Sequence, residues 1–135
     1  MDFKEITELI GDYPVQEVLS KQCGQTCAEF ITGIPTKKIC DALDNNYSTN
    51  IFTELVPFIR KQGFDIYIVY AYESHLSFDD IPDDSLIRLH KNDGGGHFVV
   101  KKNGVYVDPS GEIVLSYSEK KFKVSHYAPF KKRES

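Results

Sequence analysis

The chain has 135 residues, of which 41% are apolar and 27% charged, and this composition excludes a disordered or fibrous protein. Its length fits one domain over residues 1–135, with a core between about residues 14 and 130. The formal net charge of −4 argues against nucleic acid as a partner, because phosphate binding requires concentrated lysine and arginine. No apolar run approaches the roughly 20 residues of a membrane-spanning helix, so no membrane partner is expected.

The cysteine content indicates the compartment. There are three cysteines, an odd number, and the N-terminus lacks the charged-then-apolar layout of a signal peptide. Free thiols in a reducing compartment are therefore expected, which predicts a cytoplasmic location.

Apolar residues at helical spacing dominate the first half of the chain. Glycines and prolines mark where the periodic segments stop, because glycine readily ends a helix and proline breaks or bends one. The pattern predicts helices over residues 3–10, over about residues 20–32 up to Gly33, from Thr36 through Ile39, Cys40 and Leu43, and from Ile51 to Gly63 with a bend at Pro57.

From Phe64 onward the pattern changes to that of β-strands, rich in β-branched and aromatic residues. Because no helix alternates with these strands, parallel crossovers are not expected. Helices first and a meandering sheet afterwards predict an α+β fold. The expected strands cover residues 66–72, 85–90, two runs within 97–107, then 112–115 and 122–127.

The pair Asn103-Gly104 lies between two β-rich runs and predicts a tight hairpin. Both residues tolerate the positive φ that a type I′ turn requires, which makes this the strongest short hairpin signal. With these two as the loop residues, Val100 pairs with Val107.

The hairpin register fixes which side chains share a face, because side chains alternate along a strand. His97 and Asp108 become diagonal neighbours, roughly 7–8 Å apart at the backbone, within reach for a carboxylate to hold an imidazole. Val99 and Tyr106 share that face. A polar strand end with a solvated histidine is the alternative interpretation. The opposite face is apolar and is expected to meet the core through Phe98, Val100, Val105 and Val107.

Cys23 lies where the predicted helix over residues 20–32 begins, with Ser20 as a suitable cap. A thiol in the first turn lies among unpaired backbone N–H groups at the positive end of the helix dipole, which favours the thiolate. A neighbouring imidazole would complete the activation and later protonate the leaving group. Cys23 is therefore the candidate nucleophile, with His97 and Asp108 as its candidate partners.

Other polar residues near the thiol leave alternatives open. Cys27 follows one helical turn later and is expected to be buried, yet it is the alternative nucleophile. Candidate oxyanion donors are Gln16, upstream of the thiol, and Gln22, next to it, although both could equally be surface residues. Cys40 is expected in the core. The histidines lack the paired spacing of structural zinc modules, so neither a metal nor another cofactor is expected.

Taken together and in this order, the motifs resemble the papain-like cysteine peptidase superfamily. The pattern is most similar to the bacterial branch that contains the bacteriocin-processing peptidase domains of ABC exporters, and to related domains of polymorphic bacterial toxins. The resemblance spans residues 16–116 and rests on Gln-Cys-Gly-x-Thr-Cys at residues 22–27, on the segment 55–69, on His-Phe-Val-Val at 97–100 and on Val-Asp-Pro at 107–109.

The resemblance implies a papain-like fold in which N-terminal helices, with the nucleophile at a helix N-terminus, pack on an antiparallel β-sheet. It implies Cys23 as nucleophile, His97 as general base and acid, and Asp108 as the group that orients the imidazole. It also implies an oxyanion glutamine about six residues before the thiol. Here the chain departs from the pattern, because Gln16 lies seven residues before Cys23 and Glu17 occupies the expected place.

The superfamily cleaves peptide or isopeptide bonds, deamidates glutamine side chains and transfers acyl groups, all through an acyl-thioester at the cysteine. The expected function is therefore a thiol hydrolase that acts on a protein amide, with a protein or peptide as substrate. By the same resemblance, a toxin or effector module would be delivered into a target cell and neutralised by an immunity or inhibitor protein. The alternatives are a catalytically silent module that binds a peptide or protein partner, and a structural domain whose matches are accidental.

Overall fold

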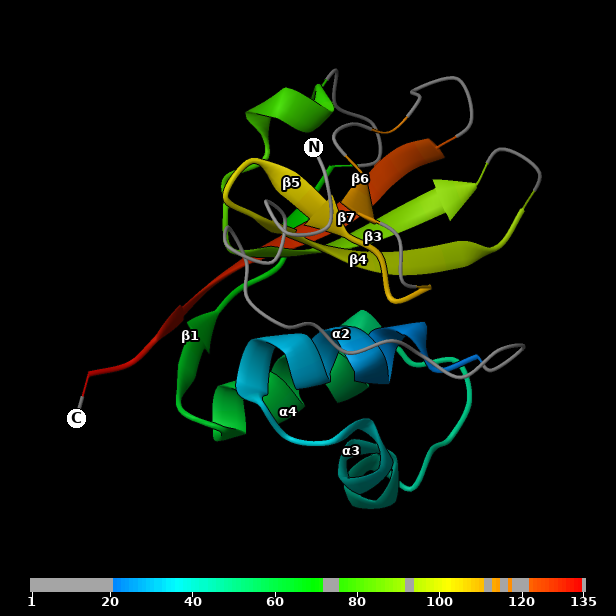
Figure 1. The fold of residues 1–135 in the computed structure, drawn as a ribbon, viewed down its shortest axis with the longest axis vertical. Helices are drawn as coiled ribbons and strands as arrows, with labels where there is room; N and C mark the ends of the chain where they lie inside the picture. Colours follow the sequence, from blue (N-terminus) through cyan, green and yellow to red (C-terminus); the bar gives the residue numbers. More distant parts are fainter. Residues whose placement is uncertain are drawn as a thin grey trace.

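The computed structural model describes residues 21–71, 76–91, 94–110, 113–114, 117 and 122–134. The helix expected over residues 3–10 and the residues Gln16 and Ser20 lie outside these ranges. The helix expected from about residue 20 begins later, at Cys23, so the prediction of Ser20 as its cap is wrong: Gln22 stands at the N-cap position. Within them the chain forms a helical layer on one side of an antiparallel sheet (Figure 1), which is the α+β arrangement that the sequence predicts. None of the helices in this part of the chain combines the length and the apolar character needed to cross a bilayer.

The helical layer holds α2 (Cys23–Thr32), α3 (Thr36–Leu43) and α4 (Val56–Lys61). α2 ends at Gly33, whose φ of 81° glycine adopts without strain. The helix expected from Ile51 is divided into a short π-helical segment, η1 (Ile51–Leu55), and α4. Pro57 is the second residue of α4, directly after the junction between η1 and α4.

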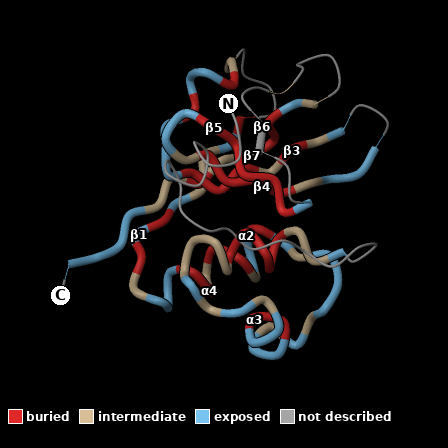
Figure 2. The backbone as a smooth tube through the Cα atoms, in the orientation of Figure 1, coloured by how far each residue is buried: buried red, intermediate tan, exposed pale blue. Residues whose placement is uncertain are grey.

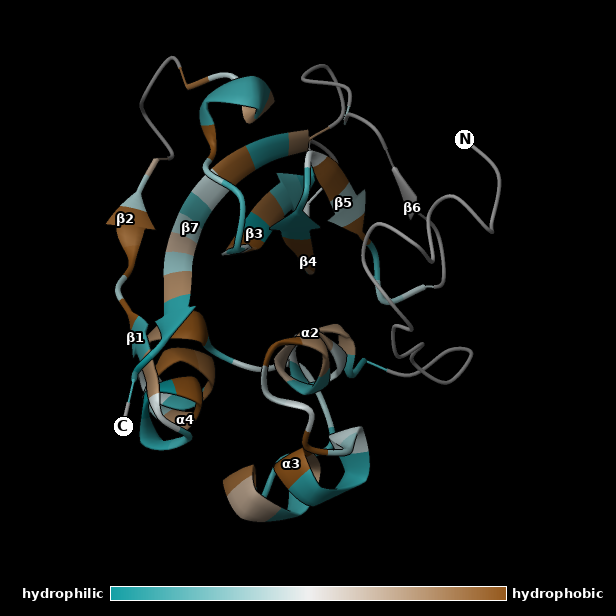
Figure 3. Ribbon diagram, turned by 60° about the vertical axis from the view of Figure 1, so that its left-hand side comes forward, coloured by the Kyte–Doolittle hydropathy of each residue, from teal (hydrophilic) through white to brown (hydrophobic). Residues whose placement is uncertain are grey.

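Within the described ranges, seven antiparallel strands form the sheet in the order β1-β7-β3-β4-β5-β6, and β2 pairs with β7. The strand expected over residues 66–72 is divided between β1 and β2, and β7 extends beyond the expected end at 127, curving along the sheet (Figure 3). The bounds are β1 (Phe64–Ile66), β2 (Val69–Tyr70), β3 (Ser85–Lys91), β4 (Gly96–Lys102), β5 (Val105–Val107), β6 (Ile113–Val114) and β7 (Phe122–Lys132), with a 3-10 turn η2 (Phe78–Asp80) before β3.

The β4–β5 hairpin has the predicted register, with Val100 opposite Val107. Asn103 and Gly104 form the loop, and their φ values of 51° and 79° are both positive, as a type I′ turn requires. This prediction from the sequence is confirmed. The start of β4 therefore lies next to the segment that follows β5.

Strands β4 and β5 are buried on both faces of the sheet. Phe98 and Val100 of β4 pack on the buried side of α2, including Ala28, so the face expected to meet the core does so (Figure 2). The opposite face is also covered, since Tyr106 is 1% exposed and packs with Phe78 of η2. Apolar side chains thus pack against β4 from both sides, and this packing holds the strand rigidly.

α2 approaches β4 closely because Gly24 has no side chain. A Cβ at Gly24 would collide with Thr49 Oγ1 and crowd Leu55 and Phe98. The first turn of α2 is therefore in direct contact with the sheet and with the loop before η1. This contact places the residue before Gly24, the candidate nucleophile, at the junction of the two layers.

Candidate active site

Cys23 is the first residue of α2 and is half-buried. Its thiol lies close enough to the side chain of His97 and to the main-chain N–H groups of Phe98 and Gly24 for these groups to lower its pKa. The thiol from the helical layer and the imidazole from the sheet are thus brought together where α2 crosses the start of β4. This is the juxtaposition that the sequence motifs predict.

His97 is the second residue of β4, and its side chain is 20% exposed. Its Nε2 lies 3.0 Å from both Oδ1 and Oδ2 of Asp108. Because Nε2 faces the carboxylate, Nδ1 is the ring nitrogen left for the sulfur of Cys23. The imidazole is therefore oriented to exchange a proton with the thiol at one nitrogen and to hold a proton toward the carboxylate at the other.

Asp108 directly follows β5 and is 7% exposed. Besides the bond from His97, its Oδ1 accepts from the N–H of Ser110 at 3.0 Å and its Oδ2 accepts from the Tyr117 hydroxyl at 2.9 Å. A buried carboxylate with three donors is fixed in position and kept ionised. It is therefore suited to orient an imidazole.

Tyr117 is a site residue that the sequence reasoning missed. Asp108 and Tyr117 are separated by nine positions in a segment without regular periodicity, so no spacing pattern relates them. The bond from Ser110 is different, because an aspartate that accepts from the N–H two residues later forms an Asx turn, and Asp-Pro-Ser is compatible with one. That local signal was available in the sequence.

The electrostatics of the three side chains favour an ion pair. Burial alone raises the pKa of the Cys23 thiol, but the hydrogen bond and charge of His97, with the N–H groups of Phe98 and Gly24, outweigh it and lower the pKa below 9.0. Burial lowers the pKa of His97, yet the bonds and charges of Asp108 and Cys23 raise it to about 9. For Asp108, burial raises the pKa, and the bonds from His97 and Ser110 bring it down to about 2. A thiolate beside an imidazolium is a strong nucleophile at neutral pH.

Cys27, the alternative nucleophile, is 2% exposed and packs in the core between α2 and the sheet. Burial, together with the charges of Cys23 and Asp108, raises the pKa of its thiol well above the ordinary value. A protonated, enclosed thiol is a poor nucleophile, so the geometry favours Cys23. Cys40 is buried on α3, where the sequence places it in the core.

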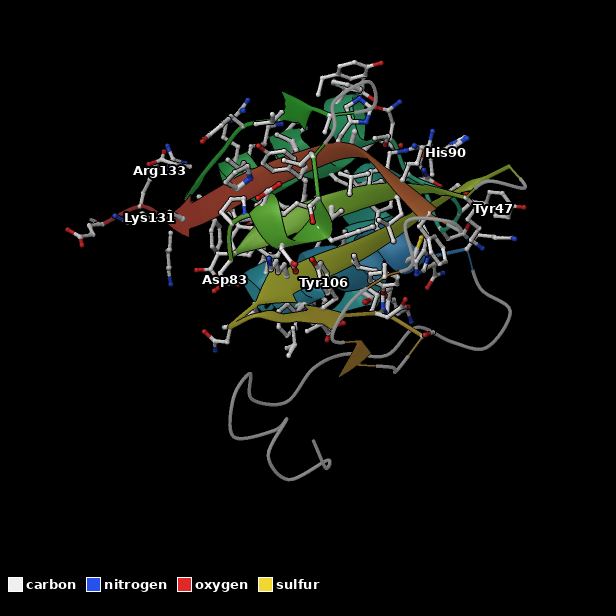
Figure 4. All side chains as sticks on the ribbon, turned by 90° about the horizontal axis from the view of Figure 1, so that it is seen from above. Tyr47, Asp83, His90, Tyr106, Lys131 and Arg133 are labelled. Atoms are coloured by element: carbon white, nitrogen blue, oxygen red, sulfur yellow. The ribbon has the colours of Figure 1, made fainter. Side chains whose placement is uncertain are left out.

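The candidate oxyanion residue Gln22 precedes α2, and its Nε2 donates to the main-chain oxygen of Asn46 at 3.2 Å. Gln25, which sequence reasoning did not single out, is fully buried and donates from Nε2 to the main-chain oxygens of Asn45 (3.0 Å) and Tyr47 (2.8 Å). These bonds tie residues 45–47 to the first turn of α2. Figure 4 shows Tyr47 at the same end of the molecule as His90 of β3.

No protein-family model matches the chain, and no curated protein matches it. Among the described residues, no three His, Cys, Asp or Glu side chains are grouped in a way that would hold a metal ion. Function is therefore inferred from the geometry of Cys23, His97 and Asp108 and from the motifs around them.

Proposed function

We propose that the chain is a papain-like thiol hydrolase that acts on a protein amide, either a peptide bond or a glutamine side chain. The observation that carries the proposal is the grouping of the three side chains. The Nε2 of His97 lies 3.0 Å from both carboxylate oxygens of Asp108, and His97 is close enough to Cys23 to lower the pKa of its thiol. The lowered pKa of the thiol and the order of the three residues along the chain support it further.

In the first step the Cys23 thiolate attacks the amide carbonyl carbon, and the carbonyl electron pair moves to oxygen. The main-chain N–H groups in the first turn of α2 have no side-chain cap, lie beside the sulfur and can donate to this oxyanion. When the tetrahedral intermediate collapses, the C–N bond breaks and His97 gives its Nδ1 proton to the departing nitrogen. The products are an acyl-thioester on Cys23 and a free amine, or ammonia from a glutamine side chain.

In the second step His97, now neutral, takes a proton from water as the water oxygen attacks the thioester carbon. The C–S bond then breaks, the acid product leaves and the thiolate–imidazolium pair is restored. Asp108 stays ionised throughout, since its pKa of about 2 is far below neutral pH, and stabilises the imidazolium in both resting and final states. The net reaction is the addition of one water molecule across the amide bond.

Alkylation with iodoacetamide near pH 6, followed by mass spectrometry, tests the proposal. Cys23 should be modified much faster than Cys27 and Cys40, which serve as internal controls, and the preference should disappear in His97→Ala. Slow labelling of all three thiols alike would refute the activated nucleophile and would favour a catalytically silent binding module.

The bond that is attacked can be identified by incubating an unfolded protein mixture with the wild-type chain and with Cys23→Ala. New N-termini that depend on Cys23 would identify a peptidase, and conversion of glutamine to glutamate would identify a deamidase. If Cys23 is reactive but neither new N-termini nor conversion of glutamine is found, hydrolysis of protein amides is contradicted.

The biological setting is a prediction from the resemblance alone. A toxin or effector module would have a cognate immunity or inhibitor protein as partner and would act in the cytoplasm of a target cell. Growth arrest on cytoplasmic expression of the wild-type chain, absent with Cys23→Ala, is the expected result. Equal growth with both chains would count against this setting.

A further inference from the structure

A groove of about 540 Å³ lies between the helical layer and the sheet. One wall is formed by residues 48–52 together with Glu54. The other wall is formed by Arg88 of β3 and His126 of β7, which pair with each other in the sheet. Its volume is that of a typical ligand site and accommodates the side chains of an extended peptide.

The groove adjoins the catalytic side chains at two points. Thr49, in one wall, is the residue that a Cβ at Gly24 would strike, and Gly24 follows the nucleophile. Arg88, in the other wall, is the residue that a Cβ at Gly96 would strike, and Gly96 precedes the catalytic histidine. The groove is therefore lined by two residues, Thr49 and Arg88, that lie against the chain neighbours of the two reacting groups.

Arg88 supplies a positive charge to the groove. Its guanidinium is half-buried, and one nitrogen donates to the neutral hydroxyl of Ser125 at 3.0 Å. In the part of the chain that the structure describes, Arg88 forms no ion pair. A partly buried guanidinium whose other N–H groups donate to none of the described residues matches the two oxygens of a carboxylate.

The other groups of the groove leave this charge available. Glu54 is held by its own loop, since Oε1 accepts from the N–H of Asn50 and Oε2 accepts from Nδ2 of Asn45, each at 2.9 Å. Burial and the charge of Arg88 lower the pKa of His126, so that imidazole is neutral at neutral pH. The ring of His126 lies edge-on to Phe52, with centroids 5.0 Å apart, and forms an aromatic side of the same groove.

We propose that this groove is a specificity subsite in which Arg88 binds a carboxylate of the substrate close to the amide that Cys23 attacks. The inference rests on the proposed function, because it concerns the substrate of the same site. The carboxylate belongs either to an aspartate or glutamate side chain or to a chain terminus. The aromatic side of the groove packs against the carbon atoms of that residue.

Peptide Michael acceptors that extend on both sides of the reactive carbon test the proposal. Each matched pair of probes differs at one position, which carries glutamate in one probe and glutamine in the other. The position is one of the two before or the two after the reactive carbon, and the C-terminus is amidated. A further probe carries glutamine and a free C-terminal carboxylate. The readout is the second-order rate of labelling of Cys23 at neutral pH, measured by mass spectrometry. One glutamate probe, or the free-acid probe, should react roughly tenfold or more faster than its glutamine amide counterpart, as expected for a charge-assisted bond.

The preference should disappear in Arg88→Gln and should persist in part in Arg88→Lys. In Arg88→Glu it should reverse in favour of a lysine probe, a result that misfolding cannot produce. Lys91→Gln, an exposed change on the same strand, is the matched control and should keep the wild-type preference.

Two results would overturn the subsite. One is equal labelling of Cys23 by all acidic and neutral probes. The other is a preference for acidic probes that survives in Arg88→Gln. In both cases the proposed hydrolase function is unaffected. If instead no probe labels Cys23 faster than Cys27 and Cys40, the proposed function itself is wrong and the subsite falls with it.

Discussion

Asp108→Asn removes one negative charge from beside the imidazole while keeping the shape of the side chain. The asparagine can still accept one hydrogen bond from His97, but it no longer stabilises the imidazolium. The pKa of His97 should therefore fall from about 9, and that of Cys23 should rise, because the two groups favour each other's charged forms. The thiolate–imidazolium pair becomes less populated at neutral pH.

The expected magnitudes follow from the pKa of Asp108, which lies at about 2 against an ordinary 3.8. That difference corresponds to roughly 2–3 kcal/mol of folding free energy. A lowered pKa contributes stability that is complete above 3.8 and is lost as the pH falls through about 2. The variant should thus lose roughly 2 kcal/mol at pH 7, and the loss should shrink toward pH 2. Turnover should fall by about 10²–10⁴-fold, the range of general acid–base contributions.

Denaturant unfolding at several pH values measures the stability term, and the pH dependence of Cys23 alkylation measures the thiol pKa. Asp41→Asn, an exposed change on α3, is the control and should alter neither. A variant that unfolds like wild type at pH 7 and keeps full turnover would refute the role of Asp108. Loss of turnover with an unchanged alkylation profile would instead contradict the coupling between the carboxylate and the thiol.

Three further predictions concern the groups around the pair. Tyr117→Phe keeps the ring but removes the hydroxyl that donates to Asp108, and should cost about 0.5–1.5 kcal/mol of stability and reduce kcat/KM several-fold. Gly24→Ala should slow alkylation of Cys23 and cost about 1–3 kcal/mol, because its Cβ collides with Thr49. The kcat/KM of the wild-type chain should fall as the pH rises through about 9, where His97 loses the proton that the leaving nitrogen requires. The raised pKa of His97 also stabilises the folded chain. This contribution is complete below pH 6.5 and is lost as the pH rises through about 9.

Each of these has a contrary result. Equal kinetics for Tyr117→Phe and for the exposed control Tyr67→Phe would exclude the hydroxyl from the site. An unfolding midpoint for Gly24→Ala equal to that of wild type would contradict the close contact between α2 and the loop before η1. A constant kcat/KM between pH 7 and pH 10 would contradict proton donation by a histidine with a pKa of about 9.

The hairpin was predictable because its signal is local. Asn103-Gly104 requires one turn type, the turn fixes the register, and the register makes His97 and Asp108 neighbours through alternation alone. The position of Cys23 at a helix start was equally local, since it depends on where the apolar period begins. The central parts of the site thus follow from short-range backbone preferences.

What the sequence did not predict depends on contacts between distant segments. The covered second face of the sheet requires Phe78 of η2 to pack on Tyr106, and an alternating strand pattern does not show which segment will cover it. The groove requires the loop at Thr49 to meet Arg88, and its shape depends on the π-helical start of η1. Such loop geometry is decided by tertiary packing, which no periodicity encodes.

The nucleophile and its base belong to different layers, and the seam between these layers is the apolar packing of α2 on β4. Catalytic competence therefore requires docking of α2 onto β4 and not merely the formation of each. Mild denaturant or heat that loosens this seam should abolish thiol reactivity while most of the helical and strand content persists. Reactivity of Cys23 would then be an early indicator of global loosening, and distant core substitutions that shift the helix slightly would alter the rate without touching a reacting atom.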